Sequence, residues 1–195
     1  MPAANMAAPT PVPQLWPLPG HTGVMLRPPA LQDVAQLIAA GNDPDVQRFT
    51  RLPAPFTEDD ARAMVQLAAD QHATGTGIQL LAMDGDVVLG TVGLPVDRRD
   101  HTAEVGYWFA PAGRGRGICT AVVREAVRHA IEACGVQMMY LVAATDNPGS
   151  ARVAERVGFR KVGVLRQRAT VGPTGDPSNE RSDMTSYDLL PADLI

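Results

Sequence analysis

The chain of 195 residues is poor in cysteine and has no long hydrophobic run. Its two cysteines cannot build a disulfide framework, because Cys119 and Cys134 fall on one expected helix about 22 Å apart, beyond disulfide reach. No apolar run approaches the roughly 18 residues of a membrane span, and the N-terminus lacks the basic and apolar regions of a signal peptide. These absences predict a reduced, cytoplasmic protein with no membrane partner.

The charge balance excludes a second group of partners. The 17 Lys+Arg residues stand against 21 Asp+Glu residues and leave a net charge of -4, which argues against nucleic acid held by bulk charge. The histidines are scattered, and no ligand spacing indicates a metal site. The length and the 45% hydrophobic composition indicate a single folded domain with a sizeable core.

The N-terminal 22 residues differ in composition from the rest of the chain. Residues 1–20 contain six prolines and no charged side chain, and proline removes backbone donors and favours extended structure. The sequence therefore predicts a Pro-rich tail or arm over residues 1–22 and one folded domain over residues 23–195. A disordered tail is one alternative; the other is an arm packed through Trp16 and Leu18 onto the body or onto a second subunit, as in a homodimer.

Hydrophobic periodicity predicts an α/β domain with a mixed sheet. The expected order is strand, two helices, three strands, helix, strand, helix and two strands, which makes about seven strands and about four helices. The clearest helical stripe runs from Cys119 to Cys134. The strands at 103–110 and 138–145, which that helix joins, should form a right-handed parallel unit. Residues 42–55 are expected to form a loop.

A segment rich in glycine and arginine, between the strand at 103–110 and that helix, carries the strongest functional signal. It reads Phe-Ala-Pro-Ala-Gly-Arg-Gly-Arg-Gly-Ile-Cys-Thr over residues 109–120. Glycine lets a ligand approach the backbone, and a helix N-terminus offers unpaired N–H groups, so the segment predicts a phosphate site. No Gly-Lys-Ser/Thr follows as in a Walker A loop, and a dinucleotide fingerprint fits poorly. A plain connection with solvated arginines is the alternative.

Three blocks of sequence, in this order, resemble the GNAT acyltransferases. The segment Arg114-Gly-Arg-Gly-Ile-Cys119 is similar to the family's pyrophosphate-loop pattern Q/R-x-x-G-x-G/A, with cysteine at the sixth position. Residues 103–111 resemble the family's fourth strand, and residues 147–159 resemble its asparagine-to-Gly-Phe helix. The two-helix insert and the Asn-x-x-Ser helix are most similar to the RimJ/RimL branch, which acetylates protein N-terminal amines. The resemblance implies a GNAT fold whose sheet splays where the coenzyme enters.

The resemblance also implies where an acyl-CoA co-substrate, acetyl-CoA in the first place, would bind without a metal. Backbone groups near Phe109 and Ala110 would hold the pantetheine arm like an added strand, and amides from Gly115 to Thr120 would hold the pyrophosphate. The Asn147 side chain would bond the pantetheine, although a helix cap explains this residue equally. The implied coenzyme-binding residues are Phe109, Ala110, Arg114, Gly115, Arg116, Gly117, Cys119, Thr120 and Asn147.

Two side chains are the implied catalytic residues. Glu104 lies in an Ala-Glu-Val setting similar to the base-bearing strand of histone-acetylating relatives, and a strand-edge ion pair is its alternative role. Relatives place a tyrosine acid where this chain has Ala154, so Ser150 is the implied proton donor to the leaving sulfur, or else a plain first-turn residue. Strand alternation puts Tyr107 on the face opposite to Glu104. Cys119 is expected to be buried, which disfavours an acyl-carrying nucleophile.

The acceptor side carries weaker signals. The resemblance places it at Phe49, Arg51, Phe56 and the loop at 172–180. Nearby acidic residues would suit a cationic amine, although three of the five belong to a helix cap; they are Asp43, Asp45, Glu58, Asp59 and Asp60. The expected acceptor is a primary amine, either a protein N-terminal α-amine or a small molecule. A non-catalytic acyl-CoA-binding sensor of the same fold is the alternative.

Overall fold

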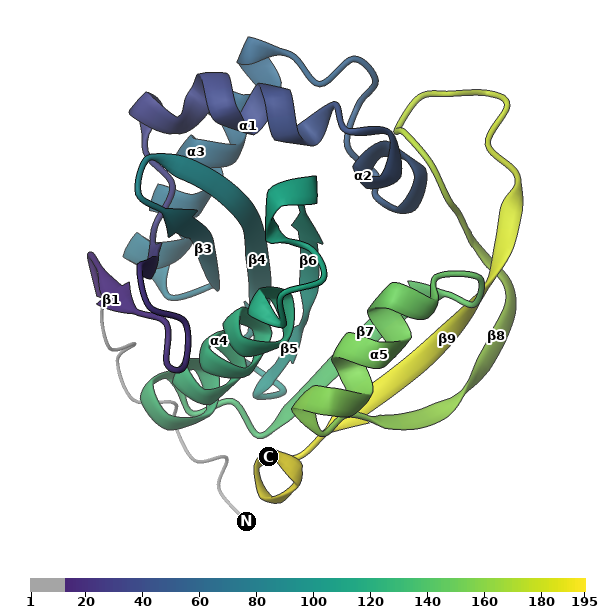
Figure 1. The fold of residues 1–195 in the computed structure, drawn as a ribbon. Helices are drawn as coiled ribbons and strands as arrows, with labels where there is room; N and C mark the ends of the chain where they lie inside the picture. Colours follow the sequence, from purple (N-terminus) through teal and green to yellow (C-terminus); the bar gives the residue numbers. More distant parts are fainter. Residues whose placement is uncertain (1–12) are drawn as a thin grey trace.

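A computed structural model describes residues 13–195 of the chain. Within these residues one mixed sheet runs in the order β1-β2-β3-β4-β5-β7-β9-β8, and β6 pairs with β4 beside this path (Figure 1). The strands are β1 (Trp16–Pro17), β2 (Val24–Arg27), β3 (Gly77–Asp84), β4 (Val87–Asp97), β5 (Thr102–Glu104), β6 (Gly106–Phe109), β7 (Met138–Ala144), β8 (Arg160–Thr170) and β9 (Arg181–Leu189). The helices are α1 (Val34–Gly41), α2 (Pro44–Phe49), α3 (Glu58–Thr74), α4 (Ile118–Cys134) and α5 (Pro148–Val157).

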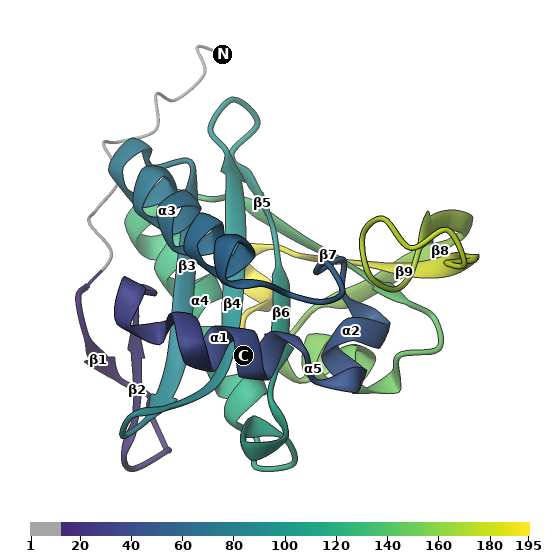
Figure 2. The same cartoon turned by 90° about the horizontal axis from the view of Figure 1, so that it is seen from above.

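Helices cover both faces of the sheet (Figure 2). Successive residues of a strand point to opposite faces, and on β3 Leu81 packs in the core under α1 and α3, whereas Leu80 packs in the core under α4. Most of the stripe predicted on α4 is buried, up to Cys134, whereas Cys119 and Ile131 are only partly buried. None of the helices in residues 13–195 has the length and apolarity that crossing a bilayer requires.

The predicted α/β class and mixed sheet are confirmed, with two additions near the N-terminus. Helix α2 lies inside the segment expected to be a loop, because Asp43 accepts the N–H groups of Asp45 and Val46 and a proline occupies the first turn. Strand β1, which belongs to the segment predicted as an arm, pairs with β2, and Leu18 is buried. Residues 1–12 of that arm lie outside the described residues.

The sheet splits at Val105, where the strand expected at 103–110 divides into β5 and β6. Strand β5 pairs in parallel with β7, Ala103 lying opposite Met139, so the predicted parallel unit is confirmed. The N–H of Val105 donates to the carbonyl of Tyr140 on β7 at 2.8 Å. Beyond it, β6 pairs with β4 and with no other described strand. The prediction of one continuous strand is therefore wrong, and the free edge of β6 faces an opening in the sheet.

Candidate active site

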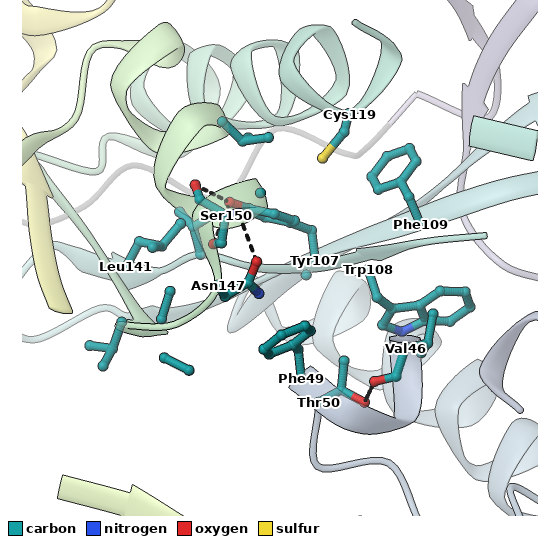
Figure 3. A pocket seen from close by; sticks show the side chains of 18 of the residues that line it. Val46, Phe49, Thr50, Tyr107, Trp108, Phe109, Cys119, Leu141, Asn147 and Ser150 are labelled. Carbon is teal, nitrogen blue, oxygen red and sulfur yellow. Dashed lines mark hydrogen bonds between the residues drawn. The ribbon is translucent and has the colours of Figure 1, made fainter. Parts of the chain in front are cut away.

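A cleft of about 1110 Å³ opens where β6 and β7 part (Figure 3). Its walls come from α2, β3, β4, β6, the glycine-rich turn at 113–117, β7, the start of α5 and the end of β8. Most residues predicted for the site line it, namely Glu104, Phe109, Arg114, Gly115, Gly117, Cys119, Thr120, Asn147 and Ser150. Two of the residues predicted to bind the coenzyme do not line it: Ala110 is buried, and Arg116 is exposed with its guanidinium 3.5 Å from Asp84.

Two glycines give the turn before α4 a shape that other residues rarely adopt. Gly115 has φ 72° and Gly117 has φ 76°, both in the left-handed region. Gly117 directly precedes α4, whose first N–H groups have no partner within the helix. A Cβ on Gly115 would meet no atom within 4 Å, so this side of the turn is open. The turn presents the positive end of a helix dipole to the cleft, which is the chemistry of a phosphate site.

The sequence assigned Arg114 to the phosphate site, but in the structure its guanidinium pairs with carboxylates at the start of α2. Its guanidinium pairs with Asp43 and lies 2.9 Å from Asp45, and its Nε donates to the Phe109 carbonyl at 2.8 Å. Burial alone would raise the pKa of Asp43, but hydrogen bonds from Arg114 and from the Val46 N–H hold it below its usual value. Arg114 thus fixes α2 and the glycine-rich turn to β6. Attraction of an anion falls mainly to the N–H groups of α4.

Strand β6 turns the backbone of Phe109 toward the opening. The N–H of Ala110 donates to the Leu89 carbonyl on β4 at 2.9 Å. Because backbone groups alternate along a paired strand, those of Phe109 point to the opposite edge. The Phe109 carbonyl keeps a second lone pair there beside its bond from Arg114. The geometry favours Phe109, and not Ala110, as the residue that an extended ligand would pair with.

Glu104 lies at the end of β5, where the sheet splits. Its side chain is exposed and lines the cleft, and Tyr140 on β7 donates its hydroxyl to Glu104 Oε2 at 3.4 Å. Burial and the neighbouring carboxylate raise the pKa of Tyr140, which keeps that hydroxyl a neutral donor. Glu104 makes no ion pair within the described part of the chain. Tyr107 packs against the same core cluster as Val105, so it lies on the face opposite to Glu104 as the alternation predicts, although both residues line the large cleft.

Ser150 is held at the first turn of α5 by two neighbours. Asn147 Oδ1 accepts the Ser150 N–H at 3.1 Å, so the helix-cap role of Asn147 is present. The Tyr107 hydroxyl lies 2.9 Å from Ser150 Oγ and 3.2 Å from its carbonyl (Figure 3). The position of Ala154 is fully buried and offers no acid. The hydroxyl groups of Tyr107 and Ser150 are therefore the proton donors that the cleft offers at the start of α5.

Burial sets the protonation of two further groups in the cleft. It raises the pKa of Tyr107 well above the usual range, and it raises the pKa of Cys119 to about 12. Figure 3 shows the Cys119 sulfur pointing into the cleft. Both groups stay protonated at neutral pH, so Tyr107 acts as a hydrogen-bond donor. Cys119 has the character of a packing thiol and not of a thiolate nucleophile.

The far end of the cleft is less acidic than the sequence suggests. Phe49 and Arg51 line it as predicted. Phe56 does not, because it is 2% exposed and packs in the core of α1 and α3, so its assignment to the acceptor side is wrong. The carboxylates of Asp43 and Asp45 are taken by Arg114. The other three acidic residues form the first turn of α3 and do not line the cleft.

Sequence reasoning missed several polar residues of this cleft, among them Gln79, Thr91 and Arg168. Gln79 donates to the Thr91 hydroxyl at 2.6 Å, and both line the wall formed by β3 and β4. A polar residue inside the apolar strand at 78–83 was a usable signal for Gln79. Arg168 also lines the cleft, and no local pattern marked it. Among the described residues, no group of three His, Cys, Asp or Glu side chains is placed to hold a metal ion.

Comparison with known proteins identifies relatives along most of the chain. The family described as Acetyltransferase (GNAT) domain matches residues 24–160. The chain is 28% identical over 156 residues to the uncharacterized N-acetyltransferase YoaA of Bacillus subtilis (strain 168), covering 78% of this chain and 88% of that protein. It is 27% identical over 124 residues to the ribosomal-protein-serine acetyltransferase of Escherichia coli (strain K12), covering 63% and 69%.

Solved structures share the fold. RimL, a ribosomal L7/L12 alpha-N-protein acetyltransferase in complex with coenzyme A, matches with a TM-score of 0.78 and 20% identity, over 89% of this chain and 97% of that chain. The microcin C7 self-immunity acetyltransferase MccE, in complex with acetyl-CoA and AMP, matches with a TM-score of 0.76 and 20% identity, over 87% of this chain and 93% of that chain.

Proposed function

The chain belongs to the GNAT acetyltransferase family, and from this premise we propose that it moves an acetyl group from acetyl-CoA to a primary amine by direct attack. One observation carries the proposal. A single cleft joins the open N-terminus of α4 to Glu104 on one side and to Ser150 on the other. The relatives with solved structures include complexes with coenzyme A and with acetyl-CoA, which supports the choice of co-substrate.

The residues of the cleft fit a coenzyme with a pyrophosphate and an extended arm. The turn formed by Gly115 and Gly117 leaves room beside its backbone, and the N–H groups up to Thr120 can hold phosphate oxygens. The free edge of β6 at Phe109 can pair with the arm as a strand would. The Asn147 amide nitrogen donates to no described residue, and the side chain lines the cleft, so it can bond the arm as well as cap α5.

The amine must be neutral before it attacks the thioester, and Glu104 is the proposed base. At pH 7 an α-amine loses its proton for about 1 kcal/mol, whereas a lysine requires about 4.6 kcal/mol. The nitrogen bonds to the carbonyl carbon and gives its proton to Glu104, while the carbon–sulfur bond breaks. A protein N-terminal α-amine is the first acceptor class that we propose, and the ribosomal-protein-serine acetyltransferase among the relatives supports it.

The leaving sulfur takes a proton from Ser150, which Tyr107 orients, and Ser150 is reprotonated by water in the open cleft. Replacing Ser150 by alanine should lower kcat at least about tenfold, because a positioned acid contributes roughly 10²–10⁴-fold. Tyr107→Phe removes only the donor to Ser150 and should have a smaller effect, with a stability loss of about 1 kcal/mol. Steady-state kinetics and thermal unfolding of both variants measure this. A Tyr107→Phe loss of kcat that exceeds that of Ser150→Ala would assign the acid role to Tyr107.

Acetyl-CoA should raise the melting temperature of the full chain. At 100 times its Kd a ligand stabilises a protein by about 2.7 kcal/mol, which is roughly 5–10 °C for a domain of this size. ATP and NAD serve as controls, since they share phosphates but lack the pantetheine arm. A shift with acetyl-CoA that the controls do not reproduce supports the site. No shift with acetyl-CoA, succinyl-CoA or free CoA would overturn the proposed function.

A further inference from the structure

Strand β8 carries a bulge beside the far end of the cleft. Leu165 pairs with Met184 and Ala169 pairs with Ser182, so residues 166–168 lie opposite the single residue Asp183. Gln167, in the middle, has φ 50°, a left-handed conformation that a non-glycine residue adopts only at a cost. Bulges next to active sites re-aim side chains, and local strain of this kind gathers at functional sites.

Two residues of β9 hold the bulge in place. Asp183 Oδ1 accepts the Gln167 N–H at 2.9 Å. Arg181 donates from Nε to the Gln167 carbonyl at 2.7 Å and from Nη2 to the Arg168 carbonyl at 3.2 Å. The backbone on both sides of the strained residue is therefore fixed. The last residue of the bulge, Arg168, lines the cleft.

Arg168 and Arg51 line the same hollow. Both line the cleft, and both also line an adjoining hollow of about 470 Å³ under the β8–β9 loop. That loop is tied to the segment after α2, because Thr174 donates its N–H to the Leu52 carbonyl at 3.3 Å and its hydroxyl to the Arg51 carbonyl. Figure 1 shows α2 and this loop side by side at the rim of the opening. Two guanidinium groups from distant parts of the chain thus share the acceptor end.

The charge of this hollow is positive and unbalanced. Arg51, Arg168 and Arg181 line it, and none of them makes an ion pair within residues 13–195. The acidic residue among its lining residues is Asp176, whose Oδ1 is bonded by the N–H and hydroxyl of Ser178 at 2.8 and 2.7 Å. Three cationic side chains therefore stand against one carboxylate that already has partners.

We infer that the acceptor is a peptide N-terminus with a carboxylate side chain close to its α-amine, and that Arg51 and Arg168 bind this carboxylate. The inference rests on the proposed function and specifies its substrate. Guanidinium groups bind carboxylates through paired, charge-assisted hydrogen bonds. Both arginines line the cleft that Glu104 also lines, so a peptide bound to them can extend its amine along the cleft toward Glu104. This charge preference is the reverse of the one that the acidic residues near α2 suggest in the sequence.

The test compares two matched peptides, Ser-Asp-Glu-Ala-Ala and its amide counterpart Ser-Asn-Gln-Ala-Ala, as acceptors for acetyl-CoA. The wild-type chain should show a kcat/KM at least about tenfold higher for the acidic peptide, the equivalent of about 1.4 kcal/mol. The double variant Arg51→Gln/Arg168→Gln should lose that preference and leave the neutral peptide within about threefold. Arg166→Gln is the matched control, because Arg166 lies on the same strand and lines neither hollow; it should keep the preference.

The possible failures can be told apart. Equal kcat/KM for the two peptides, or an equal loss on both in the double variant, overturns the acidic acceptor and leaves the acetyltransferase function standing. Acetylation of free glutamate in place of both peptides overturns the peptide as the source of the carboxylate. Acetylation of none of these amines, with a melting-temperature shift by acetyl-CoA retained, also overturns the inference. If that shift is absent as well, the proposed function itself fails.

Discussion

Replacement of Glu104 by glutamine is expected to produce the largest loss of turnover of any single substitution in the cleft. A correctly positioned general base contributes roughly 10²–10⁴-fold to the rate. We therefore expect kcat to fall by at least about tenfold and by at most about 10⁴-fold. Glutamine keeps the size of the side chain and its bond from Tyr140, which lies 3.4 Å away, but it cannot take a proton. Steady-state kinetics with a saturating amine would measure the loss.

The Glu104→Gln result is informative only if acetyl-CoA still binds. Glu104 ends β5, whereas the glycine-rich turn before α4 follows the other end of β6, so the acetyl-CoA-induced melting shift should be unchanged. Glu132→Gln is a matched control, because Glu132 is an exposed carboxylate on α4 that does not line the cleft. An unchanged kcat in Glu104→Gln would remove this residue from the mechanism and leave desolvation and positioning of the amine as the source of catalysis.

Features that depend on neighbours in the sequence could be predicted. The buried stripe of α4 follows from apolar residues at helical spacing, and Thr57 caps α3 together with Asp60 as their spacing indicates. Gly85 makes the tight turn between β3 and β4 with φ 57°. Each of these features needs only a few adjacent residues, which is why periodicity and capping rules recover them.

Contacts between distant residues could not be predicted in the same way. Arg114 carries a charge that the sequence shows, but its partner Asp43 lies 71 residues away. Tyr107 and Ser150 are 43 residues apart, and they meet because β6 leaves the sheet path and faces α5. Most of the residues that the sequence assigned to the site line the cleft. The sequence did not show which of these residues already form ion pairs or hydrogen bonds within the protein. Those interactions determine whether a side chain is available to bind a ligand.

The break at Val105 shows why a one-residue feature has a large effect on a predicted site. Alternation along an unbroken strand would put Glu104 and Tyr107 on opposite faces. The parallel pairing of β5 with β7 ends at Glu104, and the Val105 N–H still bonds β7 while the next residues pair with β4. Glu104 and Tyr107 stay on opposite faces, but the change of partner opens the sheet between β6 and β7, and both residues line the cleft that results. No residue type in this segment signals the change, because it arises from the register of two other strands.

The close approach of β4 and β6 leads to the second large prediction, that Gly90→Ala strongly destabilises the fold. A Cβ on Gly90 would lie 2.5 Å from the Phe109 ring and 2.6 Å from the Trp108 carbonyl. The carbonyl belongs to the backbone of the neighbouring strand, so the contact can be relieved only if β6 moves. Overpacking typically costs about 1–3 kcal/mol. A clash with a backbone carbonyl belongs at the upper end of that range, so the melting temperature should fall by roughly 6–12 °C. Thermal unfolding of the ligand-free chain measures it.

Gly163→Ala is the matched control for this prediction, because Gly163 is also a strand glycine and a Cβ there would meet no atom within 4 Å. Its melting temperature should stay close to that of the wild type. The same displacement of β6 should weaken coenzyme binding, because the backbone of Phe109 on β6 faces the opening. The melting shift induced by acetyl-CoA should therefore be smaller in Gly90→Ala than in Gly163→Ala. A Gly90→Ala variant with wild-type stability and a full shift would mean that β6 can move without cost, and would contradict the role of its free edge in binding.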